Sequence, residues 1–391
     1  MILDSRYWIL AIQNPESGNQ NSVMQKFFDQ FSRYFVGALF IFSGLIKLND
    51  PIGTQVKMEE YFEVFADDFG SFFHHFIPWS LEIGMVMIVL EAALGVAILF
   101  FWRMKWTGWV LLLLMVFFTF LTFYSAYFNK VTDCGCFGDA IKLTPWQSFT
   151  KDVVLMGFVF HLFWYKHTYV PVLRTREGDG VIIAVTGLSL FAGIYAVNHL
   201  PFIDFRAYKI GNNIPKQMQP QEEPVIEYVF EKDGKEIKSQ KYLSEAGYKY
   251  ISSKVLNEDK IKPKITDYSA TTPEGEDKTA YTFEGNKLII VLFNVDKASI
   301  KNISAVRELT QKLEGKVDCF ILTASSNESI EKFRHENQLA VPYYFSDATV
   351  LKTIIRSNPG IALWQNGNVL GNWHHNDTPS AEEVLKLISQ K

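Results

Sequence analysis

Long apolar stretches alternate with short polar loops through the first half of the chain, and the pattern changes after about residue 205. A membrane-spanning helix needs about 20 predominantly apolar residues. The stretches that approach this length are Arg33–Leu48, Trp79–Trp102, Trp106–Phe128, Trp146–Pro171 and Val181–Phe202. Tryptophan and tyrosine recur near their ends, as they do at membrane–water interfaces. We therefore expect a five-helix membrane region.

The second half of the chain predicts short strands and amphipathic helices. A hairpin is expected where Val225–Glu231 and Glu236–Leu243 flank an Asp-Gly turn, after a linker at residues 213–224. Beyond Ile265 strands and helices alternate. The expected elements are the strand Leu288–Val295, the helix Ser299–Leu313, the strand Val317–Thr323, the helix Glu328–Asn337, the hairpin strands Ile361–Gln365 and Val369–Trp373, and the helix Ser380–Gln390. This order favours a thioredoxin-like α/β layer.

These patterns predict four parts. We assign residues 1–25 to an N-terminal extension, 26–205 to the membrane domain, 206–260 to a juxtamembrane linker and hairpin, and 261–391 to the thioredoxin-like domain. The fold class is thus an α-helical membrane bundle followed by an α/β domain.

The basic residues of the short loops predict the orientation of the spans. The turn Arg103–Lys105 and the loop Lys166–Arg176 are basic, which places both in the cytoplasm. The N-terminus then lies inside, whereas the loop around residue 135 and everything after the last span lie outside. We expect a multi-pass protein of a bacterial inner membrane with a periplasmic C-terminal domain.

Composition narrows the class of partners. Aromatic residues make up 15% of the chain, charged residues 20%, and the net charge is −4. No basic, aromatic patch is visible, so nucleic acid is not an expected partner. The expected partners are the lipid bilayer and an extracytoplasmic protein.

The most specific chemical feature is the run DCGCFGD at residues 133–139. It holds Cys134 and Cys136, two of the three cysteines of the chain. Extended residues i and i+2 lie about 7 Å apart, so a disulfide requires a tight turn that the intervening glycine permits. We interpret the pair as a redox dithiol facing an oxidising compartment, with a structural disulfide as the alternative.

The neighbours of the pair act on the thiols in opposite directions. Asp133 and Asp139 disfavour a thiolate, while Lys130, Lys142 and the start of the next helix favour one, so the direction of the thiol pKa stays open. That helix begins with Thr-Pro-Trp-Gln, a capping box with proline at its first position. A metal site is disfavoured because no further cysteine or histidine lies nearby.

Glu91 is a carboxylate in the middle of the second span. Such residues face a bundle interior, a partner or water. Glu91 is expected to be either a proton acceptor for a redox carrier or a packing hydrogen-bond partner. His161 in the fourth span is expected to be a satisfied core histidine rather than a ligand.

The segments Phe42–Lys47, Asp50-Pro51 and residues 133–139 resemble the DoxX/MauE group of membrane proteins over roughly residues 26–170. The resemblance implies a four-helix membrane bundle associated with thiol or quinone redox chemistry, and MauE-type members are associated with maturing disulfide-rich periplasmic proteins. It also implies that Phe137 belongs to the site and that a quinone is the candidate cofactor.

The C-terminal part resembles thioredoxin-like domains of the peroxiredoxin or periplasmic reductase type. Ile265–Ser269, Thr272–Gly275 and the strand Leu288–Val295 carry this resemblance, and Pro359 occupies the place of a cis-proline. The segment Asn294–Lys301 departs from the family because it lacks the expected Cys-x-x-Cys. Cys319, the remaining cysteine, is expected to be a buried small hydrophobe.

These expectations lead to two functional hypotheses. In the first, the chain is a thiol–disulfide or quinone-linked oxidoreductase that uses Cys134 and Cys136, and the loop at Pro359 binds the partner protein. In the second, the chain is a non-enzymatic membrane scaffold whose thioredoxin-like domain binds a partner.

Overall fold

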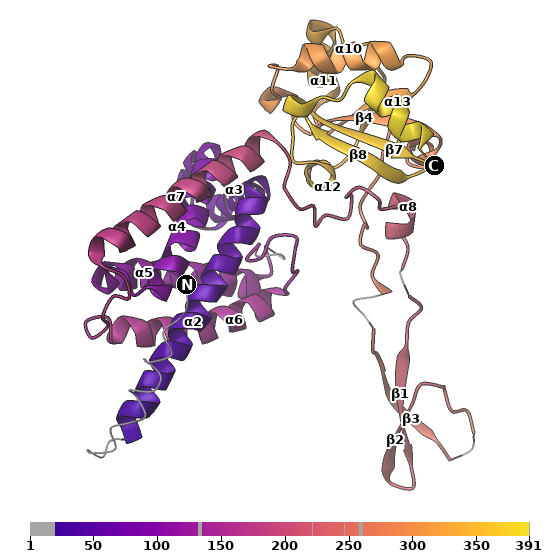
Figure 1. The fold of residues 1–391 in the computed structure, drawn as a ribbon. Helices are drawn as coiled ribbons and strands as arrows, with labels where there is room; N and C mark the ends of the chain where they lie inside the picture. The colour runs from indigo at the N-terminus through magenta and orange to yellow at the C-terminus, as the bar shows by residue number, and fades with distance from the viewer. Residues whose placement is uncertain (1–19, 132–134, 221, 246, 258–260, 391) are drawn as a thin grey trace. The chain divides into compact units, whose positions relative to one another are not determined.

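The computed structural model describes residues 20–131, 135–220, 222–245, 247–257 and 261–390, with side chains from residue 24 onward. Cys134 and Asp133 lie outside these ranges, as does most of the expected N-terminal extension. The chain divides into two compact units, Met1–Ile194 and Tyr195–Lys391. Each unit is described by itself (Figure 1).

The first unit is helical. Its elements are α2 (Gln20–Asn49), α3 (Pro51–Phe69), the 3₁₀ helix η1 (Ser71–Trp79), α4 (Ser80–Leu99), α5 (Met104–Phe128), α6 (Pro145–Trp164) and α7 (Thr175–Asn198). Four segments of the described chain are long and apolar enough to cross a membrane: Met24–Asn49, Ser71–Leu99, Met104–Phe128 and Thr175–Asn198. The chain is therefore a multi-pass membrane protein.

Helix α6 corresponds to the remaining expected span. It has 20 residues, which gives it a length of about 30 Å, but Lys151 and Asp152 interrupt its apolar sequence. The predicted capping box at its start is confirmed, because Thr144 and Gln147 each bond the backbone N–H of the other. The side chains of Leu155, Val159 and Leu162 are buried at helical spacing, so α6 packs into the bundle.

The segment between the first two spans is a helix, whereas the sequence predicted a loop. Asp50 caps α3 by accepting a hydrogen bond of 2.9 Å from the Gly53 N–H, and Pro51 occupies the first helical position. The apolar side chains of Met58, Phe62 and Phe65 are buried on one side of α3. Acidic residues lie between these apolar positions. The segment was therefore not recognised as a helix when long apolar stretches were sought.

Helices α2 and α4 approach each other closely through small residues. A Cβ atom on Gly95 would lie 2.8 Å from the Ile41 nitrogen and 3.0 Å from the Gly37 carbonyl oxygen. A Cβ atom on Gly44 would lie 3.0 Å from the Ala92 nitrogen. Small residues allow this contact between membrane helices.

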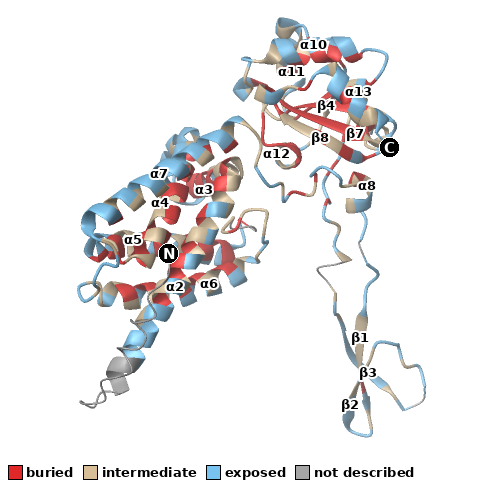
Figure 2. Cartoon of the chain, in the orientation of Figure 1, coloured by how far each residue is buried: buried red, intermediate tan, exposed pale blue. Residues whose placement is uncertain are grey.

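The outer faces of the helices are apolar. Large exposed side chains include Phe42, Leu45, Trp106, Leu113, Phe160 and Phe191. An apolar surface of this extent fits contact with lipid rather than water. Figure 2 shows buried residues on the inner sides of the same helices.

The second unit contains the thioredoxin-like fold. Its elements include the strands β4 (Asn286–Leu292), β5 (Asp318–Thr323), β6 (Tyr343–Phe345), β7 (Gly360–Gln365) and β8 (Asn368–His374) and the helices α10 (Ile303–Leu313), α11 (Asn327–Asn337), α12 (Ala348–Ile354) and α13 (Ala381–Ser389). The strand order is β6-β5-β4-β7-β8. Strands β4, β5 and β6 are parallel to one another. Strand β7 pairs antiparallel with β4, and β8 pairs antiparallel with β7. This topology confirms the predicted fold class.

Side chains alternate between the two faces of this sheet. Leu288, Ile290 and Leu292 of β4 pack with α10, α11 and α13, whereas Ile289 and Val291 pack with α12. Figure 1 shows α10 and α11 together over the sheet. The short elements β6 and α12 were not predicted, because a three-residue strand and a helix of two turns show too little periodicity. The predicted cis peptide before Pro359 is confirmed.

Part of the expected linker belongs to the core of this domain. Tyr208 and Ile214 are buried beside Trp364, and the short helix α8 (Ile214–Gln217) falls within the predicted linker. The Gly211 N–H bonds the Val369 carbonyl at 2.9 Å. Tyr208 and Ile214 are widely spaced apolar residues that show no period, so the sequence pattern missed this contact.

A separate three-stranded antiparallel sheet has the order β2-β1-β3. The predicted hairpin corresponds to β1 (Ile226–Lys232) and β2 (Lys235–Ser239), so its second strand is shorter than expected. The third strand, β3 (Lys249–Val255), is mostly exposed and was not predicted.

Candidate functional site

A cavity of about 90 Å³ lies inside the helical bundle, between α2, α3, α4, α5, α6 and the cysteine loop. Much of its wall is apolar, formed by side chains such as Leu39, Met115 and Phe118. Its polar and ionisable lining is Ser43, Lys47, Thr54, Lys57, Tyr61, Glu91, Thr122, Cys136, Lys151 and Asp152. The cavity thus concentrates charged groups within a membrane-embedded unit.

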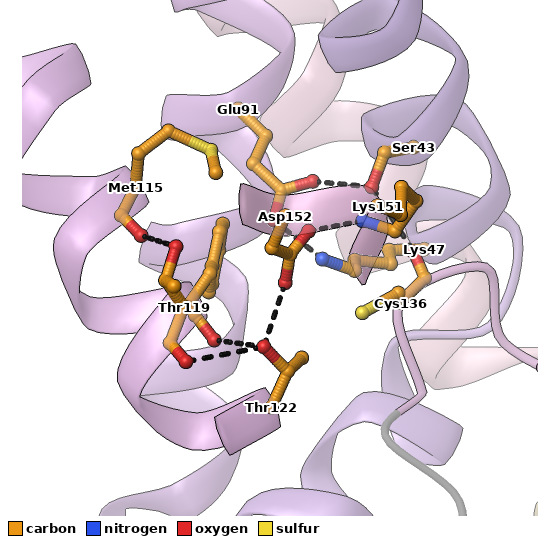
Figure 3. A network of polar contacts seen from close by, with 10 residues as sticks. Ser43, Lys47, Glu91, Met115, Thr119, Thr122, Cys136, Lys151 and Asp152 are labelled. Carbon is orange, nitrogen blue, oxygen red and sulfur yellow. Dashed lines mark hydrogen bonds and ion pairs between the residues drawn. The ribbon is translucent and has the colours of Figure 1, made fainter. Parts of the chain in front are cut away.

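Both carboxylate oxygens of Glu91 on α4 have partners on α2. Its side chain is 2% exposed, and its Oε1 atom lies 2.5 Å from the Lys47 Nζ atom. The Ser43 hydroxyl lies 2.8 Å from Oε2 of the same carboxylate. Burial in a low dielectric strengthens this ion pair and makes either charge costly alone. Both partners project from α2 toward the cavity (Figure 3).

A second polar group joins α5 and α6. Asp152 is buried, its Oδ2 accepts a hydrogen bond of 3.0 Å from the Thr122 hydroxyl, and its Oδ1 pairs with Lys151 Nζ. These contacts satisfy the carboxylate from two helices. Figure 3 shows Lys151 and Asp152 facing the same space as Glu91 and Lys47.

The cysteine loop closes onto these groups. Gly135 and Gly138 adopt φ values of +65° and +50°, which favour glycine, and the Gly138 N–H bonds the Gly135 carbonyl at 3.1 Å. The Ser43 hydroxyl lies 3.0 Å from the Cys136 carbonyl oxygen. The loop is therefore tied to the same serine that contacts Glu91.

Phe137 anchors the loop in the bundle. Its ring is 9% exposed, lies 5.5 Å from the Phe42 ring, and has the Lys151 Nζ atom 5.4 Å from its centroid. The segment Gly135–Phe137 lines the cavity. The aromatic residue therefore positions the Cys136 side chain next to the charged wall.

The structure brings together three of the residues singled out from sequence. Cys136, Phe137 and Glu91 line one cavity. Asp139 is in the same loop but is not part of the cavity lining. Pro359 belongs to the other unit.

Several residues of this cavity were missed or misread. The place of Lys47 at the end of the first apolar stretch favours snorkelling toward the interface, but its ammonium pairs with Glu91 in the bundle. Lys151, Asp152 and Thr122 were not singled out. A Lys-Asp pair two turns into an apolar helix is the signal that could have drawn attention to α6.

The thioredoxin-like domain has no thiol at the usual position of the dithiol. The segment after β4 forms the short helix η3 (Val295–Lys297), which Asn294 caps. The Asn358 amide donates a hydrogen bond of 2.6 Å to the Asn294 carbonyl. Cys319 lies on β5, where burial, and to a lesser extent Asp318, raises the pKa of its thiol to about 12. Cys319 is thus protonated at neutral pH, and thiol chemistry by this domain is disfavoured.

His161 and His374 have local partners. His161 Nε2 lies 2.6 Å from Asp29 Oδ1. This histidine therefore has a hydrogen-bond partner, as expected. Burial and the neighbouring His375 lower the pKa of His374 to about 4. No cluster of three or more His, Cys, Asp or Glu residues suited to a metal ion occurs in the described ranges.

The fold and the cavity define a membrane-embedded helical bundle joined to a thioredoxin-like domain. Residues 25–165 match the family model described as methylamine utilisation protein MauE. The chain thus combines a MauE-type membrane region with a thioredoxin-like domain, as the sequence predicted.

Two individual proteins are similar to parts of the chain. Protein TlpB of Flavobacterium psychrophilum is 29% identical over 136 residues, which are 34% of this chain and 35% of that protein. The match therefore spans about a third of the length of this relative. A secreted disulfide oxidoreductase of Mycobacterium tuberculosis, described as homologous to E. coli DsbE, is 10% identical and covers 32% of this chain and 96% of its own, with a TM-score of 0.25. The thioredoxin-like assignment rests on the strand order rather than on this similarity.

Proposed function

We propose that the chain is a membrane thiol–disulfide oxidoreductase that moves electron pairs between an extracytoplasmic protein and a membrane carrier through Cys134 and Cys136. The observation that supports this most directly is the position of Cys136. It lines a cavity inside the bundle together with a buried, ion-paired glutamate. A purely structural loop gives no reason for a sulfur to face such a cavity.

The proposed exchange balances without further reactants. A thiolate of the partner dithiol attacks the Cys134–Cys136 disulfide, and the sulfur–sulfur bond breaks to give a mixed disulfide and one thiol. The second thiolate of the partner then resolves the mixed disulfide. The partner is oxidised to a disulfide, and this chain gains two electrons and two protons as a dithiol. The reverse direction uses the same steps in reverse.

As the membrane carrier we propose a quinone whose ring enters this cavity. The cavity walls are largely apolar, and the ammonium groups of Lys47 and Lys151 are donors for a carbonyl oxygen. A quinone supplies the capacity to accept two electrons and two protons from a dithiol. Glu91, held by Lys47 and Ser43, would take up or release a proton beside it.

The basic loops Arg103–Lys105 and Lys166–Arg176 support a cytoplasmic N-terminus and a periplasmic C-terminal domain at a bacterial inner membrane. In this orientation the cysteine loop faces an oxidising compartment. The thioredoxin-like domain would bind the partner protein along the Pro359 loop, since the segment following β4 carries no cysteine of its own.

Thiol trapping in intact cells tests the proposal. Cells are quenched in acid, and free thiols are then labelled with a maleimide that adds mass. Cys134 and Cys136 should pass from oxidised to reduced when respiration is blocked or when external reductant is added. C134S/C136S should abolish electron transfer between the partner protein and the membrane carrier. A pair that never changes oxidation state, with wild-type behaviour of the double variant, would refute the proposal.

A non-enzymatic scaffold remains the second candidate. It is favoured by the observation that Val295–Lys297 occupies the place of the family's dithiol, so that the domain can bind but is not equipped to exchange thiols. Under this function C134S/C136S keeps wild-type behaviour, whereas substitutions around Pro359 remove partner binding. The two functions therefore give opposite results with the cysteine variant.

A further inference from the structure

The charges on the cavity wall are unequal. Among the described residues that line it, three carry ammonium groups (Lys47, Lys57 and Lys151) and two carry carboxylates (Glu91 and Asp152). Lys57 pairs at 2.9 Å with Glu60, a half-exposed residue outside the lining. The lining itself therefore holds three ammonium groups and two carboxylates, while the third carboxylate partner, Glu60, lies outside it. A negative charge inside the cavity thus faces more ammonium groups than carboxylates.

Cys136 is the group on this wall that can become that anion. Its thiol is neutral when protonated and carries a full negative charge as a thiolate. Each carboxylate of the wall already has a lysine partner, Glu91 with Lys47 and Asp152 with Lys151. A thiolate would be a third negative charge on the lining, next to lysines that already have carboxylate partners.

Lys151 is placed to stabilise this charge. Its ammonium lies over the ring of Phe137, the residue next to Cys136, and it interacts electrostatically with Cys136. Its carboxylate partner is its sequence neighbour, and adjacent helical residues do not face each other. The long lysine side chain must therefore bend to reach Asp152. Figure 3 shows both lysines and the Cys136 sulfur directed into the same space.

We propose that Lys151 is a positioning residue that holds the Cys136 sulfur in its anionic form and makes it the nucleophile of the membrane-embedded site. This inference rests on the proposed function for its role in exchange. The ionisation itself is balanced: the thiol proton passes to solvent, the electron pair stays on sulfur, and the ammonium compensates the new charge. Thiolates rather than thiols perform disulfide exchange.

The remaining ionisable groups facing Cys136 set the size of the effect. Lys47 of α2 and Lys57 of α3 act in the same direction as Lys151, whereas Glu91 of α4 and Asp152 of α6 oppose it. Tyr61 of α3 also lines the cavity, and α5 contributes Thr122 but no charge. Neutralising Lys151 and neutralising Asp152 should therefore shift the ionisation of Cys136 in opposite directions.

The experiment measures the alkylation rate of Cys136 by iodoacetamide between pH 5 and 10. It uses the full-length protein in detergent with C134S/C319S, so that a single thiol reacts. We expect K151Q to move the midpoint up by at least one pH unit, which means about tenfold slower alkylation at a fixed pH below the midpoint. K151R should remain within about twofold of the parent, and D152N should move the midpoint down.

Two further variants make the result interpretable. Lys142 was expected from the sequence to favour a thiolate, but it is exposed and lies outside the cavity lining. K142Q therefore makes the same charge change and should leave the midpoint unchanged. K151Q/D152N removes both partners and avoids an unpaired buried carboxylate; it should have a higher midpoint than D152N alone. Size-exclusion chromatography and the thermal transition confirm that each variant is folded.

An unchanged midpoint in folded K151Q, or an equal shift in K142Q, would overturn the inference. That outcome leaves the proposed function intact if thiol trapping still shows redox cycling. Conversely, a Lys151-dependent thiolate that never changes oxidation state in cells would refute the proposed function while the role of Lys151 in ionisation stands. The two failures are therefore distinguishable.

Discussion

At the scale of single residues, Lys47 and Glu91 form a buried ion pair in which each charge compensates the other. The two side chains are 11% and 2% exposed, and the Ser43 hydroxyl supplies an additional hydrogen bond. Removing one partner leaves an uncompensated buried charge, which is more costly than the absence of both. The pair therefore contributes to stability only as a unit.

Replacing either partner alone should destabilise the bundle. We expect K47M or E91Q to cost about 3–5 kcal/mol, and the double variant K47M/E91M to cost clearly less than either. The measurement is the thermal transition of the full chain in detergent, followed by tryptophan fluorescence. K57M is the matched control, because its pair with Glu60 is partly exposed and is worth about 1 kcal/mol or less. A double variant as unstable as the sum of the singles would contradict this reading.

His374 makes the stability of the second unit depend on pH. Its Nδ1 accepts the Asn376 N–H at 3.1 Å, which requires an unprotonated nitrogen, and burial lowers the pKa of the ring to about 4. The unfolded chain binds this proton near pH 6.5. The stabilisation is thus complete above pH 6.5 and is lost as the pH falls toward 4, with a slope of about 1.4 kcal/mol per pH unit.

Unfolding of residues 195–391 between pH 7.5 and 4.5 tests this dependence. H374Q should flatten the fall in stability at acidic pH, although His375, whose pKa is also lowered by burial, contributes in the same direction. H335Q replaces an exposed histidine and should follow the wild-type curve. Identical curves for H374Q and wild type would show that His374 is not the group responsible.

At the scale of secondary-structure elements, close contact between α2 and α4 brings the site residues together. Ser43 and Lys47 lie on α2 and Glu91 on α4, and the glycines of these helices bring the backbones within reach. The capping box at the start of α6 similarly sets where Lys151 and Asp152 fall along that helix.

A methyl group at Gly95 should separate α2 from α4. We expect G95A to lower the stability of the bundle by about 1–3 kcal/mol because the added Cβ overlaps the backbone of α2. Gly157 of α6 has no atom within 4 Å of the corresponding position, so G157A should be neutral or slightly stabilising through its helix propensity. Thermal transitions of the two variants provide the comparison, and equal effects would argue against the close contact.

At the scale of the whole molecule, the orientation of the C-terminal domain depends on whether α6 crosses the membrane. Four helices satisfy length and composition, and α6 adds a crossing only if its two charges are accepted within the bundle. The contacts of Asp152 with Lys151 and Thr122 meet that condition.

A reporter joined after the last residue reads this topology directly. With α6 crossing and a cytoplasmic N-terminus, alkaline phosphatase should be active and β-galactosidase inactive, because the C-terminus lies in the periplasm. Reporters placed after Lys105 should give the reverse pattern. An inactive phosphatase at the C-terminus would mean that α6 does not cross.

Features with a local cause were predictable. The capping box, the Asp233-Gly234 turn and the strand β4 depend on neighbouring residues, and each was found at or near the expected place. The cis-proline was implied by the resemblance to thioredoxin-like domains and is also confirmed. Helix α3, strand β6 and the buried Tyr208 were missed. Their apolar residues are too few or too interrupted to show a period, and packing with distant segments stabilises them.

By itself, the sequence determined the division into an apolar helical half and an α/β half, the order of most elements and the isolation of the cysteine loop. These properties follow from composition and from periods of two or 3.6 residues, which neighbouring side chains specify. Only the tertiary structure decided that Cys136, Glu91, Lys47 and Lys151 share one cavity. The physical reason is that the packing of α2, α4 and α6 decides which charged side chains meet in the bundle. The site residues of these three helices lie 44 or more positions apart in the chain.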